Sequence, residues 1–299
     1  MSFNPDKQHT LKSSVKISGT GLHTGVMADL ILHPANPGFG YQFKRIDLPN
    51  QPVIKADCDL VTDVSRGTTL EANGAKVSTV EHVLAALVGM GVDNCLLEIN
   101  GPEMPIMDGS SMPFVELIEE AGILEQDAAK VWYSIDENIF HYDEEKRVEM
   151  VAMPAMEYQV TTLIDFNSPV LGTQHAGLKH LRDFKDHIAP CRTFCFLHEL
   201  EMLLEHNLIK GGDVNNAIVI VDKPVGDAEM ERLKNIFKKE KIEVKSEGYL
   251  NNLELRFPNE PARHKLLDVI GDLALIGYPI KARIKIGRAS CRERVYHPV

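Results

Sequence analysis

The sequence predicts an α+β fold, because strand-like and helical segments occur together in both halves of the chain. In the first half, Val26, Ala28, Leu30 and Leu32 alternate as on one face of a strand. In the second half, residues 261–276 carry apolar residues at helical spacing. We therefore expect layers of sheet and helix in each half, although no internal sequence repeat is evident.

The first half is expected to contain two helices among its strands. Residues 15–18 and 95–99 are strand-like, and the glycine-rich stretch 19–25 is typical of a loop. Residues 78–87 have one apolar stripe and a glycine shortly after them, as a helix does. A second helix is expected after Ser111, which is a candidate N-cap.

A polar segment at residues 125–130 is typical of a linker and divides the chain. We expect an N-terminal α+β domain over residues 1–127 and a C-terminal α+β domain over residues 131–285. The second domain is expected to contain strands at residues 148–153, 158–166, 217–221 and 280–284, and helices at 197–205, 227–240 and 261–276.

The composition excludes several classes of protein. A net charge of −11 argues against a nucleic-acid partner, although a few local cations could still hold a small anionic substrate. The longest apolar stretch, residues 83–92, is far shorter than the roughly 20 residues that cross a bilayer. Residues 1–16 lack the apolar core of a secretory signal, and five cysteines without a CxxC pair suit a reducing compartment. We expect a cytoplasmic protein without a transmembrane segment, and the oligomeric state is left open.

The last predicted helix carries a polar face with metal-ligand chemistry. His264, Asp268 and Asp272 follow one another at intervals of four residues, so they stack along one side of the helix. One interpretation is a solvated face with an ion pair, worth a few tenths of a kcal/mol. The other is two metal ligands one turn apart, as in helical zinc sites.

A second candidate segment begins at Ser78 and ends at His82. Ser78 and Glu81 match a capping box, which is one interpretation. In the other, His82 is a metal ligand and Glu81 is a general base beside it. With His264 and Asp268, His82 would complete a set of three ligands that leaves a fourth position for water, as in catalytic zinc sites. By spacing alone, this set is a candidate hydrolytic metal site.

Two further residues could complete such a site. Lys265 precedes the metal-ligand face and could neutralise a phosphate or an oxyanion, or could instead be a solvated lysine. Thr193 could donate a hydrogen bond to a tetrahedral intermediate, or could instead be a strand residue.

At these residues the sequence resembles the UDP-3-O-acyl-N-acetylglucosamine deacetylases of lipid A synthesis in Gram-negative bacteria. Six matching stretches follow the order of that family over nearly the whole chain, and six in order are highly specific. They are residues 19–25, 79–87, 105–110, 192–194, 211–219 and 263–273, where residues 213–215 and 269–270 are not part of the match.

The resemblance implies a fold and a set of roles. The family has two similar layered domains, each a sheet packed with two helices, and its active site lies between them. Its zinc ligands correspond to His82, His264 and Asp268, with Fe²⁺ as an alternative metal, and its general base corresponds to Glu81. Thr193 would stabilise the oxyanion and Lys265 would help to hold the substrate.

The substrate implied by the resemblance is UDP-3-O-acyl-N-acetylglucosamine, whose 2-acetamido group loses acetate while an apolar passage holds the acyl chain. Residues 223–260 are similar to family members that carry a fused acyl carrier protein dehydratase domain. The positions where we expect substrate contacts are Leu22, Phe194, Phe196, Gly211 and Ala217.

The chain departs from the family pattern at its end. The family has a histidine, oriented by the residue matching Asp272, at the position that is Cys291 here. Residues 286–299 resemble a reading frame of a sequencing adapter, so we expect a non-native tail. In the family this histidine acts as a general acid or as an electrostatic partner. If the tail is genuine, its loss predicts a catalytically impaired zinc and lipid-sugar binding protein, since a thiol cannot carry positive charge. A different zinc amidohydrolase is a third hypothesis, supported by the ligand set alone.

Overall fold

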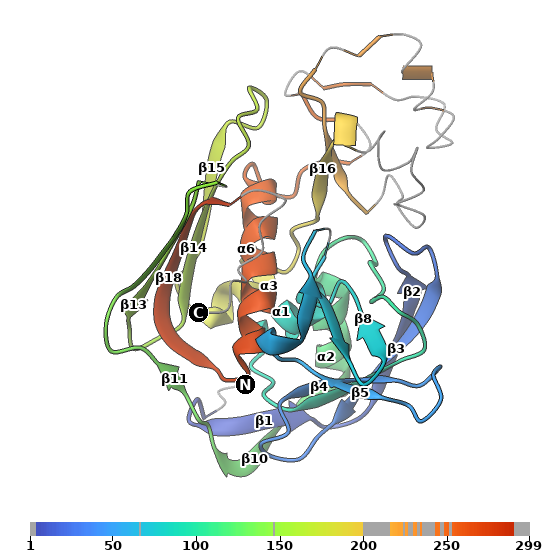
Figure 1. Ribbon diagram of the computed structural model, residues 1–299, viewed down its shortest axis with the longest axis vertical. Coiled ribbons are helices and arrows are strands. Elements are labelled where there is room, and N and C mark those ends of the chain that lie inside the picture. Colours follow the sequence, from blue (N-terminus) through green and yellow to red (C-terminus); the bar gives the residue numbers. More distant parts are fainter. Residues whose placement is uncertain are drawn as a thin grey trace.

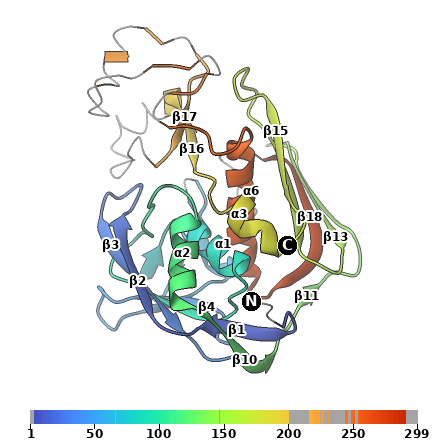
Figure 2. The same cartoon turned by 180° about the vertical axis from the view of Figure 1, so that it is seen from behind.

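The computed structural model describes residues 4–199 except 66 and 146, and also residues 216–223, 225, 226, 230, 231, 234, 243–245, 248–250 and 253–289. Two groups of strands enclose a layer of helices, as Figure 1 shows, and Figure 2 shows the same arrangement from behind. Among the helices in this part of the chain, none is both long and apolar enough to cross a bilayer.

The first half of the chain builds a five-stranded sheet whose last strand occupies the middle. The order is β2-β3-β9-β4-β5, and only β4 and β9 are parallel neighbours. A ladder of β1 with β10 and a small sheet β6-β7-β8 complete this half. The bounds are β1 Lys7–Leu11, β2 Val15–Thr20, β3 Met27–Pro34, β4 Tyr41–Arg45, β5 Val53–Lys55, β6 Val61–Asp63, β7 Thr69–Ala72, β8 Ala75–Val77, α1 Glu81–Gly89, β9 Cys95–Ile99, α2 Met112–Ala121 and β10 Ile123–Ala129.

The second half repeats this connection scheme. Its sheet has the order β12-β13-β18-β14-β15, and β18, the last of these strands in the sequence, lies in the middle and is parallel to β14. Helix α6 leads into β18 as α1 leads into β9. The bounds are β11 Tyr133–Ser134, β12 Ile139–Asp143, β13 Val148–Pro154, β14 Gln159–Asp165, β15 Thr173–Leu178, α3 Phe184–His187, β16 Phe194–Phe196, β17 Ile218–Ile220, α6 Glu260–Leu273 and β18 Ile280–Ala289.

The expectation of an α+β fold with two similar layered halves is therefore confirmed. The predicted strands at 95–99 and 148–153 and the helix after Ser111 occur where the sequence places them. The helix predicted over 78–87 begins three residues later, at Glu81, because residues 75–77 form β8. The helices predicted at 197–205 and 227–240 fall largely outside the described residues.

The linker predicted at residues 125–130 is wrong, because residues up to 129 form β10. Among the described strands it pairs only with β1, and each of its side chains is half-buried or exposed, so it can be polar without being a linker. The connection between the halves is the shorter segment 130–132, which joins β10 to β11. In the described part of the chain, every strand ladder lies within one half. The exact domain limits of 1–127, 131–285 and 286–299 stay predictions.

Helices α1 and α6 pack against each other between the two sheets (Figures 1 and 2). Residues 81–87 of α1 are all buried, which explains why this helix is apolar on every side except at its start. The two helix backbones touch at Gly271, where a Cβ atom would lie 2.0 Å from the backbone oxygen of Glu81. Only glycine at this position allows so close an approach.

A buried thiol in the first sheet makes the stability of the fold depend on pH. Cys95 on β9 is fully buried, and burial raises the pKa of its thiol to about 12. Below the ordinary pKa of a thiol, Cys95 is neutral in both the folded and the unfolded chain, so its contribution to stability is fully present. Above it, only the unfolded chain loses the proton, so the free energy of unfolding falls by about 1.4 kcal/mol per pH unit, and this loss continues until the folded-state pKa is reached.

We therefore expect Cys95→Ala to unfold with a shallower pH dependence than the parent chain between about pH 9 and pH 12. The measurement is urea unfolding at successive pH values on both proteins, because other titrating groups cancel in the difference. Parallel pH profiles for the two proteins would contradict the prediction.

Candidate metal centre

Three predicted metal ligands converge where α1 and α6 cross. His82 is the second residue of α1, and His264 and Asp268 lie one turn apart on α6. Nε2 of His82 is 3.6 Å from Oδ1 of Asp268, and Nε2 of His264 is 3.4 Å from the same oxygen. One donor atom from each residue lies within 4.8 Å of the others, and all three residues are buried.

The donor set fits a divalent metal such as zinc. Nδ1 of His264 lies 3.0 Å from the carbonyl oxygen of Cys191, which can only accept, so Nδ1 carries the proton and Nε2 keeps a lone pair directed at the cluster. Burial lowers the pKa of His264 to about 4, so its imidazole is neutral near pH 7, as a ligand must be. Two imidazole nitrogens and one carboxylate are a common catalytic zinc set.

The polar face of α6 is therefore not solvated, and that interpretation of the sequence is wrong. His264, Asp268 and Asp272 are exposed by only 3, 6 and 1 %. The capping-box interpretation of Ser78 and Glu81 is wrong as well, because α1 begins at Glu81 and the residue before it, Val80, makes no side-chain cap. Helix α1 covers the face that a single amphipathic helix would show to water.

Glu81 is held beside the metal ligands by a residue that the sequence analysis missed. The backbone N–H of Thr68 donates to Oε2 of Glu81 at 3.0 Å, and the hydroxyl of Thr68 donates to Oδ1 of Asp272 at 2.6 Å. Thr68 thus joins the predicted base on α1 to a carboxylate on α6. It lies just before β7, outside any periodic pattern, so no signal in the sequence marks it. The family histidine that Asp272 is expected to orient corresponds to position 291, outside the described residues.

Lys265 is buried in the same cluster. It is only 4 % exposed, and its Nζ is 3.6 Å from Oδ2 of Asp268. The solvated interpretation of this lysine is therefore wrong. The lysine side chain therefore lies next to the carboxylate of a predicted metal ligand.

Thr193 lies on a segment that runs along α6. The preceding residue Arg192 donates through its backbone N–H and through Nε to Oε1 of Glu260, at 3.0 and 2.9 Å. The N–H of Thr193 donates to the carbonyl of Gly109 at 2.8 Å, and its carbonyl accepts from Ile218 at 2.8 Å. Since Cys191 contacts His264, the segment is anchored to α6 at both Cys191 and Arg192, and Thr193 follows directly.

The predicted substrate contacts are distributed over two regions. Phe194 and Phe196 lie on β16. Each packs edge to face against the ring of Phe166, with ring centroids 5.6 Å apart. Ala217 precedes β17, the parallel partner of β16. Leu22 is half-buried in the loop after β2, and Gly211 lies outside the described residues.

The glycine-rich loop that contains Leu22 is tied to the metal centre by Glu103. This buried carboxylate accepts the backbone N–H groups of His23 and Thr24, at 2.9 and 2.8 Å, and the Thr24 hydroxyl at 2.7 Å. It also accepts the hydroxyl of Thr79 at 3.1 Å, two residues before Glu81. Segments that are far apart in the sequence therefore meet around the start of α1.

The family model described as UDP-3-O-acyl N-acetylglycosamine deacetylase matches residues 8–242 and 238–294 of this chain. The chain belongs to this deacetylase family. The match runs past residue 286, where we expect a non-native tail to begin, and the origin of that tail stays a prediction.

Curated relatives of two kinds are similar to the chain. A bifunctional enzyme LpxC/FabZ of Chlorobaculum tepidum is 48% identical over 284 residues, which are 94% of this chain and 61% of that relative. A bifunctional enzyme LpxC/FabZ of Bacteroides thetaiotaomicron is 46% identical over 93% of this chain and 60% of the relative. The UDP-3-O-acyl-N-acetylglucosamine deacetylase of Nostoc sp. is 38% identical over 95% of this chain and 94% of the relative. The chain thus spans about three fifths of the length of the bifunctional relatives.

Proposed function

We propose that this deacetylase-family chain hydrolyses the 2-acetamido group of UDP-3-O-acyl-N-acetylglucosamine, releasing acetate, in the cytoplasmic synthesis of lipid A in a Gram-negative bacterium. The observation that carries the proposal is the convergence of His82, His264 and Asp268 in a buried cluster beside Glu81. Relatives named UDP-3-O-acyl-N-acetylglucosamine deacetylase support the substrate.

In this proposal His82, His264 and Asp268 hold a zinc ion, and Fe²⁺ is the alternative metal in the cell. Bound zinc would act as a Lewis acid and lower the pKa of a water molecule to about 7. Glu81 takes a proton from the water molecule while the oxygen of that water attacks the acetamide carbon. The C–N bond then breaks, and protonated Glu81 can return that proton to the leaving nitrogen, which gives acetate and a free amine.

Two polar groups would stabilise the negative charge that develops on the carbonyl oxygen. Thr193 supplies a hydroxyl from the segment anchored to α6, and Lys265 supplies a buried positive charge. Phe194, Phe196 and Ala217 would line the apolar passage for the acyl chain, because Phe194 and Phe196 lie on β16 and Ala217 directly precedes its parallel partner β17.

Metal removal tests the proposal. We expect chelation to abolish acetate release and added Zn²⁺ to restore it, with one metal ion bound per chain. His264→Ala should lose both the metal and the activity. The control is His33→Ala, which changes a histidine on β3 in the first sheet and should keep both. The measurements are metal content by elemental analysis and acetate release from the acylated UDP-sugar. Tight substrate binding without turnover in the zinc-saturated chain would contradict hydrolysis and favour a binding protein.

A further inference from the structure

The segment that carries Thr193 is bonded to a turn of the first half, residues 106–111. The backbone N–H of Thr193 donates to the carbonyl oxygen of Gly109 at 2.8 Å. At the end of the turn, the hydroxyl of Ser111 donates to the carbonyl oxygen of His82 at 2.8 Å. The turn therefore joins the start of α1, which carries a predicted metal ligand, to the second-half segment that carries the predicted oxyanion group.

Gly109 brings this turn close to the Thr193 side chain. Its φ is +82°, and a Cβ atom there would lie 1.9 Å from the backbone oxygen of Asn216 and 3.2 Å from the γ-methyl carbon of Thr193. The methyl group of Thr193 thus lies beside the Gly109 backbone. Because the methyl and the hydroxyl of threonine share one carbon, a contact that fixes the methyl also fixes the direction of the hydroxyl.

Asp108 holds the turn in shape. Its Oδ1 accepts the backbone N–H of Ser110 at 3.0 Å and the hydroxyl of the same residue at 2.7 Å. A carboxylate that accepts the N–H two residues further on closes an Asx turn and stabilises the backbone between the two residues. That backbone contains the Gly109 carbonyl group to which Thr193 donates.

The other carboxylate oxygen of Asp108 is bonded to the second half. Oδ2 accepts from Nη2 of Arg256 at 2.9 Å. Nη1 of Arg256 donates to the carbonyl oxygen of Pro190, and the backbone N–H of Arg256 donates to Oε2 of Glu260, both at 2.6 Å. Glu260 also accepts from the residue before Thr193. Arg256 therefore joins the turn to the segment that carries Thr193.

This ion pair is better suited to fixing geometry than to stabilising the fold. The side chains of Arg256 and Asp108 are 38 and 33 % exposed, and exposed ion pairs contribute little to stability. Loss of the pair should therefore leave the chain folded. Any large effect of that loss on activity would come from the position of the turn.

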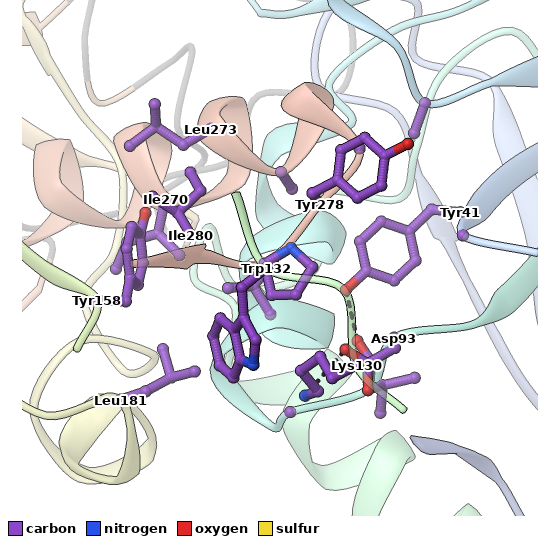
Figure 3. Close-up of a pocket in the computed structure, with 18 of the residues that line it drawn as sticks. Tyr41, Asp93, Lys130, Trp132, Tyr158, Leu181, Ile270, Leu273, Tyr278 and Ile280 are labelled. Atoms are coloured by element: carbon purple, nitrogen blue, oxygen red, sulfur yellow. Dashed lines mark hydrogen bonds and ion pairs between the residues drawn. The ribbon is translucent and has the colours of Figure 1, made fainter. Parts of the chain in front are cut away.

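Packing between the halves is not continuous along α6. Toward the C-terminal end of this helix lies a cavity of about 120 Å³, with Tyr41 of the first half and Tyr158 and Tyr278 of the second half in its wall (Figure 3). Among the residues that line it, none belongs to the turn or to the Thr193 segment. Arg256 lies at the other end of the helix, just before its first residue. Close packing at the far end of α6 therefore does not hold the turn against the Thr193 segment.

We propose that Asp108 is a positioning residue for the hydrolysis, which holds the turn 106–111 against Arg256 and thereby fixes the hydroxyl of Thr193 relative to the metal centre. This inference rests on the proposed function, in which that hydroxyl stabilises the anionic intermediate. Asp108 acts on the rate through Thr193 and not on the substrate itself. Its effect should therefore disappear when the hydroxyl is absent.

A double-mutant cycle on the rate of acetate release tests this dependence. Asp108→Asn keeps an oxygen that can accept from Ser110 but removes the charge that faces Arg256. It should lower kcat about tenfold, with KM and zinc content unchanged. In Thr193→Val, which keeps the shape and lacks the hydroxyl, Asp108→Asn should cause no further loss. A loss of the same size in both backgrounds would overturn the inference.

The matched control removes a different ion pair between the halves. Glu119 on α2 pairs with Lys185 on α3, and Glu119→Gln neutralises that pair as Asp108→Asn neutralises its own. Glu119→Gln should leave kcat unchanged, whereas Arg256→Gln should lower kcat as Asp108→Asn does. An equal loss of kcat in Glu119→Gln would mean that any contact between the halves suffices, which would also overturn the inference.

A second measurement does not need turnover. Three-bond NMR couplings from the γ-methyl carbon of Thr193 to its backbone nitrogen and carbonyl carbon report the χ1 angle in the full chain labelled at its threonines. The parent chain should show one rotamer, and Asp108→Asn should show averaged couplings. Identical couplings in the two proteins would overturn the inference. If the couplings change but the parent chain releases no acetate, the proposed function fails and the positioning of Thr193 by Asp108 stands.

Discussion

Replacing Glu81 with glutamine should lower the rate of acetate release by about 10²- to 10⁴-fold while the chain keeps its metal. Glutamine has the same shape, and its amide oxygen can still accept the N–H of Thr68 that Oε2 accepts at 3.0 Å. It cannot take a proton from water, so the loss should appear in kcat rather than in KM. Steady-state kinetics with zinc content measured on the same sample separates these effects.

The matched control is Glu71→Gln, the same change at an exposed position on β7. It should leave kcat, KM and metal content unchanged. Full turnover in Glu81→Gln would remove this residue from the role of base. Loss of metal together with activity would instead assign it a role in holding the ligands on α1.

Adding a single methyl group at Gly271 should have the second largest effect. The Cβ atom of alanine would lie 2.0 Å from the backbone oxygen of Glu81 and 2.7 Å from its carbonyl carbon. Neither helix can relieve this overlap by turning a side chain, so α1 and α6 must move apart. We expect Gly271→Ala to lower the free energy of unfolding by about 1–3 kcal/mol.

The same shift should separate His82 on α1 from His264 and Asp268 on α6, so metal affinity should fall by about 10- to 100-fold. Denaturant unfolding and competition with a zinc chelator measure the two effects. Gly177→Ala is the control, because this position on β15 is exposed and its Cβ would meet its nearest neighbour at an ordinary 3.4 Å. Unchanged zinc affinity in Gly271→Ala would mean that the close approach does not position the ligands.

The candidate metal-ligand cluster could be proposed from the sequence because its members form two local pairs. His264 and Asp268 are four residues apart on one helix, and Glu81 and His82 are neighbours, so spacing marks each pair as a candidate, and the family resemblance joins the two pairs into one site. Whether that face of the helix is solvated could not be decided in the same way. Its burial depends on α1, which lies far away in the sequence and packs onto it through Gly271.

The supporting contacts could not be predicted, because each joins distant segments through ordinary residue types. Thr68 bonds to Asp272 across 204 residues, and Arg192 bonds to Glu260 across 68. Neither pair belongs to a periodic pattern. Residue patterns did not reveal the repeated connection scheme of the two sheets, since it resides in strand order and not in similar residues, and only the family resemblance implied two similar halves. Strand β10 was mistaken for a linker because an exposed two-stranded ladder can be as polar as a loop.

The late position of each central strand has a consequence for how the protein is made. In both halves the central strand of the five-strand order, β9 or β18, is synthesised after the other four strands of that order. A growing chain therefore holds two unjoined hairpins until that strand emerges, and the second half must wait longer than the first, since β15 and β18 are far apart in the sequence. His264 and Asp268 emerge just before β18, so capture of the metal would mark the end of assembly of both halves.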